Sequence, residues 1–320
     1  MKKVIKICLL SLLLVPCSLR SQLLYEVSGN SAKAKSYIFA THPHVDITDF
    51  DSVTSSQARV SLDDVFRTFS QCGRVVTEFA FQDYEALAVM RQAALLPDSI
   101  SLKELFSPAD YEYVKDAYLL LLGLNIDSVG LLKPSYLTEL YREELLHRWL
   151  SPNTQHSAQD TLRLYSSTPL LPISTYFEAL AEEKGIPVNG LDNASETMYI
   201  SFDREPLAWQ CQELKHLIDY PEKEIAQAQE IRRLYLNGRL NDIAYCIERP
   251  DNETSLSYSD YKVFCQRNKQ WVKRLTPYLK DGRTFVTVDA IYLGGDEGLL
   301  AQIRATGFRV KPVKTKHQIH

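Results

Sequence analysis

The stretch that decides the fold lies near the end of the chain, where Thr284–Val313 reads TFVTVDAIYLGGDEGLLAQIRATGFRVKPV. Its first part, Thr284–Val288, is rich in β-branched and aromatic residues, as is typical of a buried strand. A turn that carries Asp289 and Tyr292 follows directly. Side chains at the end of a strand and before a helix often form the functional edge of an α/β protein.

A helix is predicted after this turn. Its start is indicated by Gly294 and Gly295, with Asp296 and Glu297 in the first turn, where acidic side chains suit the positive end of the helix dipole. Gly307 is placed to end the helix, and the apolar stripe between comprises Leu299, Leu300 and Ile303. The stretch therefore predicts a strand, a helix and a second strand. This pattern occurs both in units that only pack the core and in units that carry a functional site.

The rest of the chain supplies further strands separated by helical patterns. The predicted strands are Leu23–Val27, Ser36–Ala40, Arg74–Ala80 and Ile186–Leu191. Residues 84–150 have long apolar stripes at helical spacing and predict a helical insertion that forms a cap lobe. The order predicts an α/β fold with a central mixed sheet flanked by helices, built as a single domain over residues 22–320.

The first 21 residues predict a secretory signal peptide. A basic start at Lys2 and Lys3 precedes the apolar run Ile7–Val15, and small or polar residues follow. We expect cleavage after Ser21 and an exported, periplasmic or secreted protein, with lipid attachment at Cys17 as the alternative. No later stretch is apolar for long enough to predict a membrane span.

The net charge of the chain indicates which kinds of partner it is suited to bind. The signal peptide carries four of the 36 basic side chains and none of the acidic ones, which leaves 32 basic against 40 acidic side chains, a formal −8. An acidic chain without basic runs argues against a nucleic-acid partner. Four cysteines remain in the exported chain and predict either two disulfides or buried thiols: Cys72, Cys211, Cys246 and Cys265.

Two positions could carry chemistry on the residues alone. Glu78 lies within the apolar run Val75–Phe79, where a buried carboxylate needs a cation, a metal or hydrogen-bond donors; an edge strand that turns it to solvent is the alternative. His42 and His44 flank a proline directly after a predicted strand, a spacing that can chelate a metal, with Asp46 as a further oxygen ligand. A surface loop is the alternative interpretation of the two histidines.

An ordered set of segments runs through the whole exported chain: Leu23–Asn30, Ser36–Phe39, Val75–Glu78, Ala181–Asp192, the group Arg267, Asn268 and Trp271, and Thr284–Val313. In this order they resemble the TraB/GumN family, which includes pheromone-shutdown proteins and Tiki-type metalloproteases. The resemblance implies two G-x-x-H motifs, each after a strand, and a strand glutamate, gathered around a divalent metal. Glu78 stands at the glutamate position.

The motifs themselves depart from the family at the metal ligands. The first falls on Ala40–Pro43, so that proline occupies the histidine position, and the second falls on Asp289–Tyr292, so that tyrosine does. Proline offers no side-chain donor, and a neutral phenol is a poor ligand for manganese, cobalt or zinc. Whether the chain is an enzyme therefore stays open.

Three hypotheses follow from this departure. In the first, the chain keeps the fold, holds no cofactor and binds a peptide or other ligand in a cleft at the strand ends, where Glu78, Arg267 and Tyr292 are the remaining active residues. In the second, His42, His44, Glu78 and Asp289 rebuild a divalent-metal site for hydrolysis. An unrelated activity is the third. The first predicts that Arg267 neutralises Glu78 or Asp289.

Overall fold

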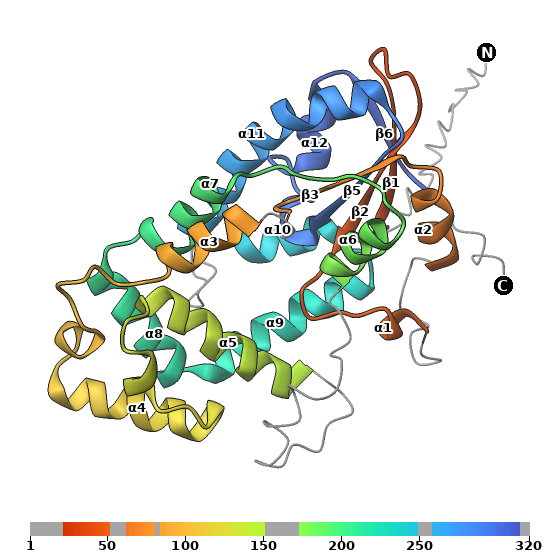
Figure 1. Cartoon of the computed structure of the whole chain (residues 1–320). Coiled ribbons are helices and arrows are strands. Elements are labelled where there is room, and N and C mark those ends of the chain that lie inside the picture. The colour runs from red at the N-terminus through yellow and green to blue at the C-terminus, as the bar shows by residue number, and fades with distance from the viewer. Residues whose placement is uncertain (1–21, 52–61, 81–83, 151–172, 249–257, 314–320) are drawn as a thin grey trace, which may run out of the picture.

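The computed structural model describes residues 22–51, 62–80, 84–150, 173–248 and 258–313. In this part of the chain one mixed six-stranded sheet has the order β4-β3-β5-β2-β1-β6 (Figure 1). The strands are β1 Leu24–Gly29, β2 Ser36–Thr41, β3 Arg74–Thr77, β4 Val188–Gly190, β5 Thr284–Asp289 and β6 Phe308–Pro312. The predicted α/β class with a central mixed sheet is confirmed. The predicted signal peptide lies outside the described residues.

Helices surround this sheet and also extend away from it (Figure 1). Their bounds are α1 Thr48–Asp51, α2 Leu62–Phe69, α3 Tyr84–Ala93, α4 Pro108–Leu122, α5 Pro134–Leu150, α6 Ile173–Glu183, α7 Ala194–Met198, α8 Leu207–Asp219, α9 Pro221–Leu236, α10 Leu240–Glu248, α11 Tyr258–Asp281 and α12 Leu299–Ala305. Short turns of other helix types are η1 Leu102–Leu105, η2 Ile126–Val129, η4 Tyr199–Asp203 and η5 Ala290–Tyr292.

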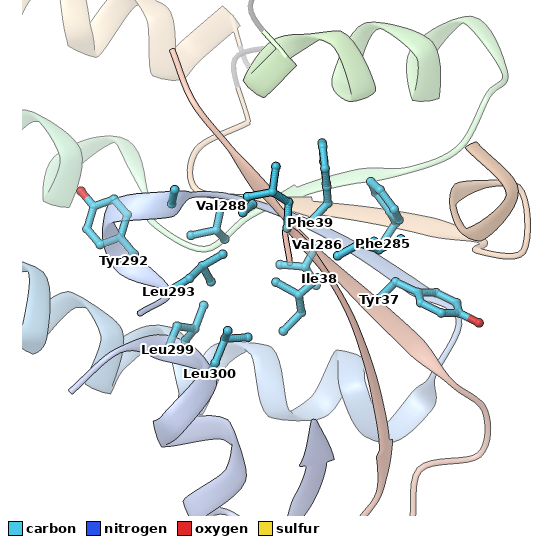
Figure 2. Packing of buried hydrophobic residues seen from close by; sticks show 14 of the residues in the cluster. Tyr37, Ile38, Phe39, Phe285, Val286, Val288, Tyr292, Leu293, Leu299 and Leu300 are labelled. Carbon is cyan, nitrogen blue, oxygen red and sulfur yellow. The ribbon is translucent and has the colours of Figure 1, made fainter. Parts of the chain in front are cut away.

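Strand β5 lies at the centre of the sheet, and its two faces anchor the two helical layers. It pairs in parallel with β2 on one side and with β3 on the other. On one face Phe285 packs with Phe39 and with Phe177 of α6, at ring-centroid distances of 6.4 and 5.1 Å. Figure 2 shows Ile38 and Val286 pointing to the opposite face, toward Leu299 and Leu300. The alternation of side chains along the strands thus supplies a core on both faces.

A second apolar core lies in the helical lobe formed by α4, α5 and α8, which Figure 1 shows below the sheet. Tyr118, Leu137 and Leu214 are fully buried there. Arg142 of α5 bonds to Glu224 of α9 at 3.1 Å, which ties the lobe to the helix that leads back to the sheet. The lobe therefore combines helices of the predicted insertion with α8, which comes later in the chain.

The predicted start of the helix in the deciding stretch is wrong by several residues. Helix α12 begins at Leu299, with Gly298 at the N-cap position, so Asp296 and Glu297 precede the helix. The physical reason is that the glycines are needed for close packing, and not that the acidic residues interact with the helix dipole. A Cβ on Gly294 would lie 2.1 Å from the carbonyl oxygen of Leu240, and one on Gly298 would lie 2.0 Å from that of Gly294. The glycines let a tight turn sit against α10.

Two further predictions are refined by the structure. Strand β3 ends at Thr77, so Glu78 follows the strand instead of lying within it, and β3 is an internal strand. Cys72 and Cys211 are buried free thiols. Within the described ranges, no helix is long and apolar enough to cross a membrane.

Candidate functional site at the carboxyl ends of the parallel strands

The carboxyl ends of four parallel strands meet at one edge of the sheet, because β2, β5, β3 and β4 run in the same direction. Asp289 is the last residue of β5, and Glu78 follows the last residue of β3. Asp192 comes two residues after the end of β4. Three carboxyl side chains are therefore placed at the edge where open α/β sheets bind ligands.

Glu78 is held by a backbone donor and faces a cation. Its Oε1 accepts a hydrogen bond of 2.8 Å from the backbone N–H of Asp289. Its Oε2 lies 3.7 Å from Nη1 of Arg267, and the side chain is 24% exposed. Burial raises the pKa of Glu78, while Arg267 and the Asp289 N–H act in the opposite direction. The carboxyl group thus remains within reach of solvent.

Asp289 caps the short helix η5. Its Oδ1 accepts a hydrogen bond of 2.9 Å from the backbone N–H of Ile291. Burial, and then the negative charge of Glu78, raise the pKa of Asp289 to about 8. At neutral pH this carboxyl group is therefore mostly protonated, and the Glu78–Asp289 pair carries less than two negative charges.

Arg267 of α11 lies at the centre of the site. Its Nε and Nη2 both contact Asp192 Oδ2 at 2.7 Å. Its guanidinium carbon lies 4.7 Å from the ring centre of Trp271 and 5.0 Å from that of Tyr292. Its Nη1 donates a hydrogen bond to the Tyr292 hydroxyl. Asp192 thus engages one edge of the guanidinium, and the adjoining rings of Trp271 and Tyr292, whose centres are 4.7 Å apart, pack beside it, so its orientation is fixed.

Asp192 binds further groups of α11 as well. Its Oδ1 accepts a hydrogen bond of 2.6 Å from Nε1 of Trp271 and lies 3.5 Å from Nη1 of Arg274. Arg274 in turn pairs with Glu196 at 2.5 Å. The residues of α11 in this network are spaced by four and three positions, which places them on one helical face. Asp192 therefore anchors the helix to the end of β4.

Tyr292 occupies the position that the second motif assigns to histidine, and its side chain is part of the core. It is 5% exposed, and its ring packs on Phe264 and Trp271 at 5.0 and 4.7 Å. Figure 2 shows its hydroxyl pointing away from the apolar cluster. Burial raises the pKa of Tyr292, so the phenol is neutral. Asn268 fixes the turn by donating to the Tyr292 carbonyl at 2.9 Å.

The two histidines after β2 belong to a different environment. His42 is 3% exposed, and its ring lies 5.3 Å from that of Tyr235 on α9. Its Nδ1 accepts a hydrogen bond of 3.1 Å from the backbone N–H of His44. Burial lowers the pKa of His42 to about 3 and that of His44 to about 4, and nearby positive groups, including Arg232, act in the same direction. Both imidazoles are neutral at pH 7.

The described side chains do not fit a divalent-metal centre in this arrangement. No group of three or more His, Cys, Asp or Glu side chains among them is placed to hold a metal ion. The structure brings Glu78, Asp289, Arg267 and Tyr292 together, as the first hypothesis requires, whereas His42 packs on Tyr235. The first ring nitrogen of His42 is also occupied by a backbone donor.

Asp192 and Arg274 were not predicted from the sequence as residues of the site. The signal was present, because an aspartate directly after a short strand and an Arg267–Trp271–Arg274 face on one helix are complementary. Glu196 could be read as the N3 residue of a capping box that begins at Asn193, which the structure contains. The sequence does not show that these two segments contact each other in the fold.

The sequence profile of the TraB/PrgY/gumN family matches residues 23–312. The chain therefore belongs to this family. No curated protein and no solved structure was found to match the chain.

Proposed function

We propose that this chain is an exported member of the family that binds a peptide or similar ligand at the carboxyl ends of its parallel strands without a metal. The observation that carries the proposal is the position of the Arg267 guanidinium, 3.7 Å from Glu78 Oε2. A guanidinium is always protonated, so it supplies a permanent positive charge beside this carboxylate. In this proposal it does so in place of a metal ion.

The surroundings of Arg267 support a binding role. Asp192 holds one edge of the guanidinium, and the adjoining rings of Trp271 and Tyr292 pack against it, so it is preorganised. Preorganised charged groups contribute to affinity because little side-chain freedom is lost when a ligand arrives. The partial exposure of Glu78 leaves the site open to a ligand.

The alternative is hydrolysis at a rebuilt metal site that uses His42, His44, Glu78 and Asp289. It would require the two imidazoles to leave the environment of Tyr235 and Arg232 and to turn toward the carboxylates. The neutral imidazoles are chemically competent as ligands, but their present packing does not favour this function.

The test uses residues 22–320 purified without chelators, a pool of random hexapeptides, and added manganese, cobalt or zinc. We expect no stoichiometric metal, no rise in melting temperature on adding metal, and retention of peptides without cleavage in mass spectra. Exchange of Arg267 for methionine should weaken retention at least about tenfold, since charge-assisted contacts are lost. The matched control is Arg309→Met, because Arg309 is exposed on β6.

Two results would overturn the proposal. One is stoichiometric bound metal together with peptide cleavage that is lost in Glu78→Gln. The other is the absence of any retained peptide from the pool.

A further inference from the structure

The facing atoms of Glu78 and Arg267 lie near each other without forming a hydrogen bond. Glu78 Oε2 and Arg267 Nη1 are 3.7 Å apart, which exceeds the length of an N–H···O hydrogen bond. Glu78 Oε1 is already used, because it accepts the hydrogen bond from the backbone N–H of Asp289. Among the described residues no donor bonds to Oε2, so this oxygen can accept a hydrogen bond from a ligand.

Arg267 keeps an N–H donor at the same place. Its Nε and Nη2 contact Asp192, and Nη1 donates one of its two hydrogens to the Tyr292 hydroxyl. The second hydrogen of Nη1 has no hydrogen-bond acceptor within the described part of the chain. The side chains of Arg267 and Glu78 are 13% and 24% exposed, so neither group is sealed from solvent.

The two charges that flank this gap determine which ligand groups suit it. A cation that approaches Glu78 also meets the permanent positive charge of Arg267, and an anion that approaches Arg267 also meets Glu78. Asp289 adds little negative charge, because burial and Glu78 raise its pKa to about 8 and it is mostly protonated at pH 7. A neutral group that donates to Glu78 and accepts from Arg267 is therefore favoured.

We propose that the gap between Glu78 and Arg267 binds a neutral polar side chain of the peptide, either the hydroxyl of serine or threonine or the primary amide of asparagine or glutamine. Each of these groups carries its donor and its acceptor on one atom or on two neighbouring atoms, which suits partners only 3.7 Å apart. Both partners are charged, and charge-assisted hydrogen bonds are the stronger ones. The inference rests on the binding function proposed above and specifies which side chain of the ligand is recognised.

The first measurement applies the pool of random hexapeptides to residues 22–320 at pH 7. We expect the retained peptides to be enriched at least about threefold in these four side chains relative to the input, as counted by mass spectrometry. A retained pool without this enrichment would overturn the inference and leave the binding function intact. A pool from which nothing is retained would reject the binding function itself.

The second measurement changes the enriched side chain in the best-retained peptide and follows binding by calorimetry. Alanine, aspartate or lysine at this position should weaken binding at least about tenfold, because each removes a donor or an acceptor and the last two add a charge. O-methylserine, which accepts but cannot donate, should bind at least about tenfold more weakly than serine. An alanine, aspartate or lysine peptide that binds as tightly as the neutral polar ones would overturn the inference.

A variant tests the role of Glu78. Glu78→Gln keeps a carbonyl oxygen for the Asp289 N–H and places an amide NH2 group where Oε2 lies. O-methylserine should then bind within about threefold of serine, since the acceptor for the ligand's donor is lost. The control Asp296→Asn removes an exposed acid from the turn before α12 and should keep the native preference. A full preference for serine in Glu78→Gln would overturn the site. If this variant does not fold, the peptide series on the native chain decides.

Discussion

The backbone N–H of Asp289 donates a 2.8 Å hydrogen bond to the carboxylate of Glu78, which joins the ends of two neighbouring strands through a side chain. The bond continues the β3–β5 pairing for one step beyond the last residue of β3. Its consequence is electrostatic, because it brings two carboxyl groups together in a partly buried place.

This pairing predicts how stability depends on pH. The pKa of Asp289 is raised from its ordinary value near 3.8 to about 8, so the folded state holds this proton more tightly than the unfolded state. The contribution to stability is therefore complete below pH of about 4 and is lost progressively as pH rises through about 8. Urea unfolding between pH 5 and 9 should show a shallower decline in Asp289→Asn than in the native chain. An identical slope in both would contradict the prediction.

The histidine after β2 should not titrate in the ordinary range. Burial lowers the pKa of His42 to about 3, below its usual value of 6.5. Its contribution to stability is thus present above pH of about 6.5 and lost as pH falls through about 3. Side-chain nitrogen NMR of the native chain, with His42→Phe to assign the signal, should show a neutral ring at pH 5. A midpoint between pH 6 and 7 would show that the ring is exposed.

Removal of the carboxylate at Asp192 should destabilise the fold. Asp192→Asn leaves the mostly buried Arg267 guanidinium without its main partner, and breaking a buried pair in this way costs on the order of 3–5 kcal/mol. Denaturant unfolding measures the change. The control Asp296→Asn removes an exposed acid and should change the free energy of unfolding by less than about 0.5 kcal/mol. A loss no greater than that of the control would show that the network is not stabilising.

The glycine turn before α12 should not tolerate a methyl group. Gly294→Ala would place a Cβ 2.1 Å from the Leu240 carbonyl oxygen, so the turn or α10 must move, at a cost of about 1–3 kcal/mol. At Gly73 nothing lies within 4 Å of the corresponding Cβ. Thermal unfolding should therefore show a lower melting temperature for Gly294→Ala than for Gly73→Ala. The reverse order would refute the packing argument.

Most strands of the sheet could be predicted from local sequence patterns. The strand patterns at Ser36–Ala40 and Thr284–Val288 correspond to β2 and β5 within one residue, because their apolar runs have β-branched and aromatic side chains that are buried on both faces. The start of α12 could not be read in the same way. Gly294 is required by contact with α10, and α10 itself was not predicted from the sequence.

The candidate site was partly predictable for a similar reason. Asp289 and Tyr292 could be placed after a strand from the chain order alone, and parallel strands bring their carboxyl ends together. Glu78 was predicted within its strand, and the structure places it directly after Thr77. Asp192 could not be recognised as the main partner of Arg267, because that contact joins residues far apart in the sequence. The environment of His42 depends on Tyr235 in the same way.

The strand order also constrains the sequence of events in folding. The central strand β5 is residues 284–289, and it separates β3 from β2. A nascent chain that ends before β5 thus has neither the parallel partner of β2 nor that of β3, and both would present open hydrogen-bonding edges. Such chains should collapse or aggregate rather than fold stepwise, because the long-range pairings form only when the last strands have been synthesised. A central strand that comes so late in the chain delays formation of the sheet until nearly all of the residues are available.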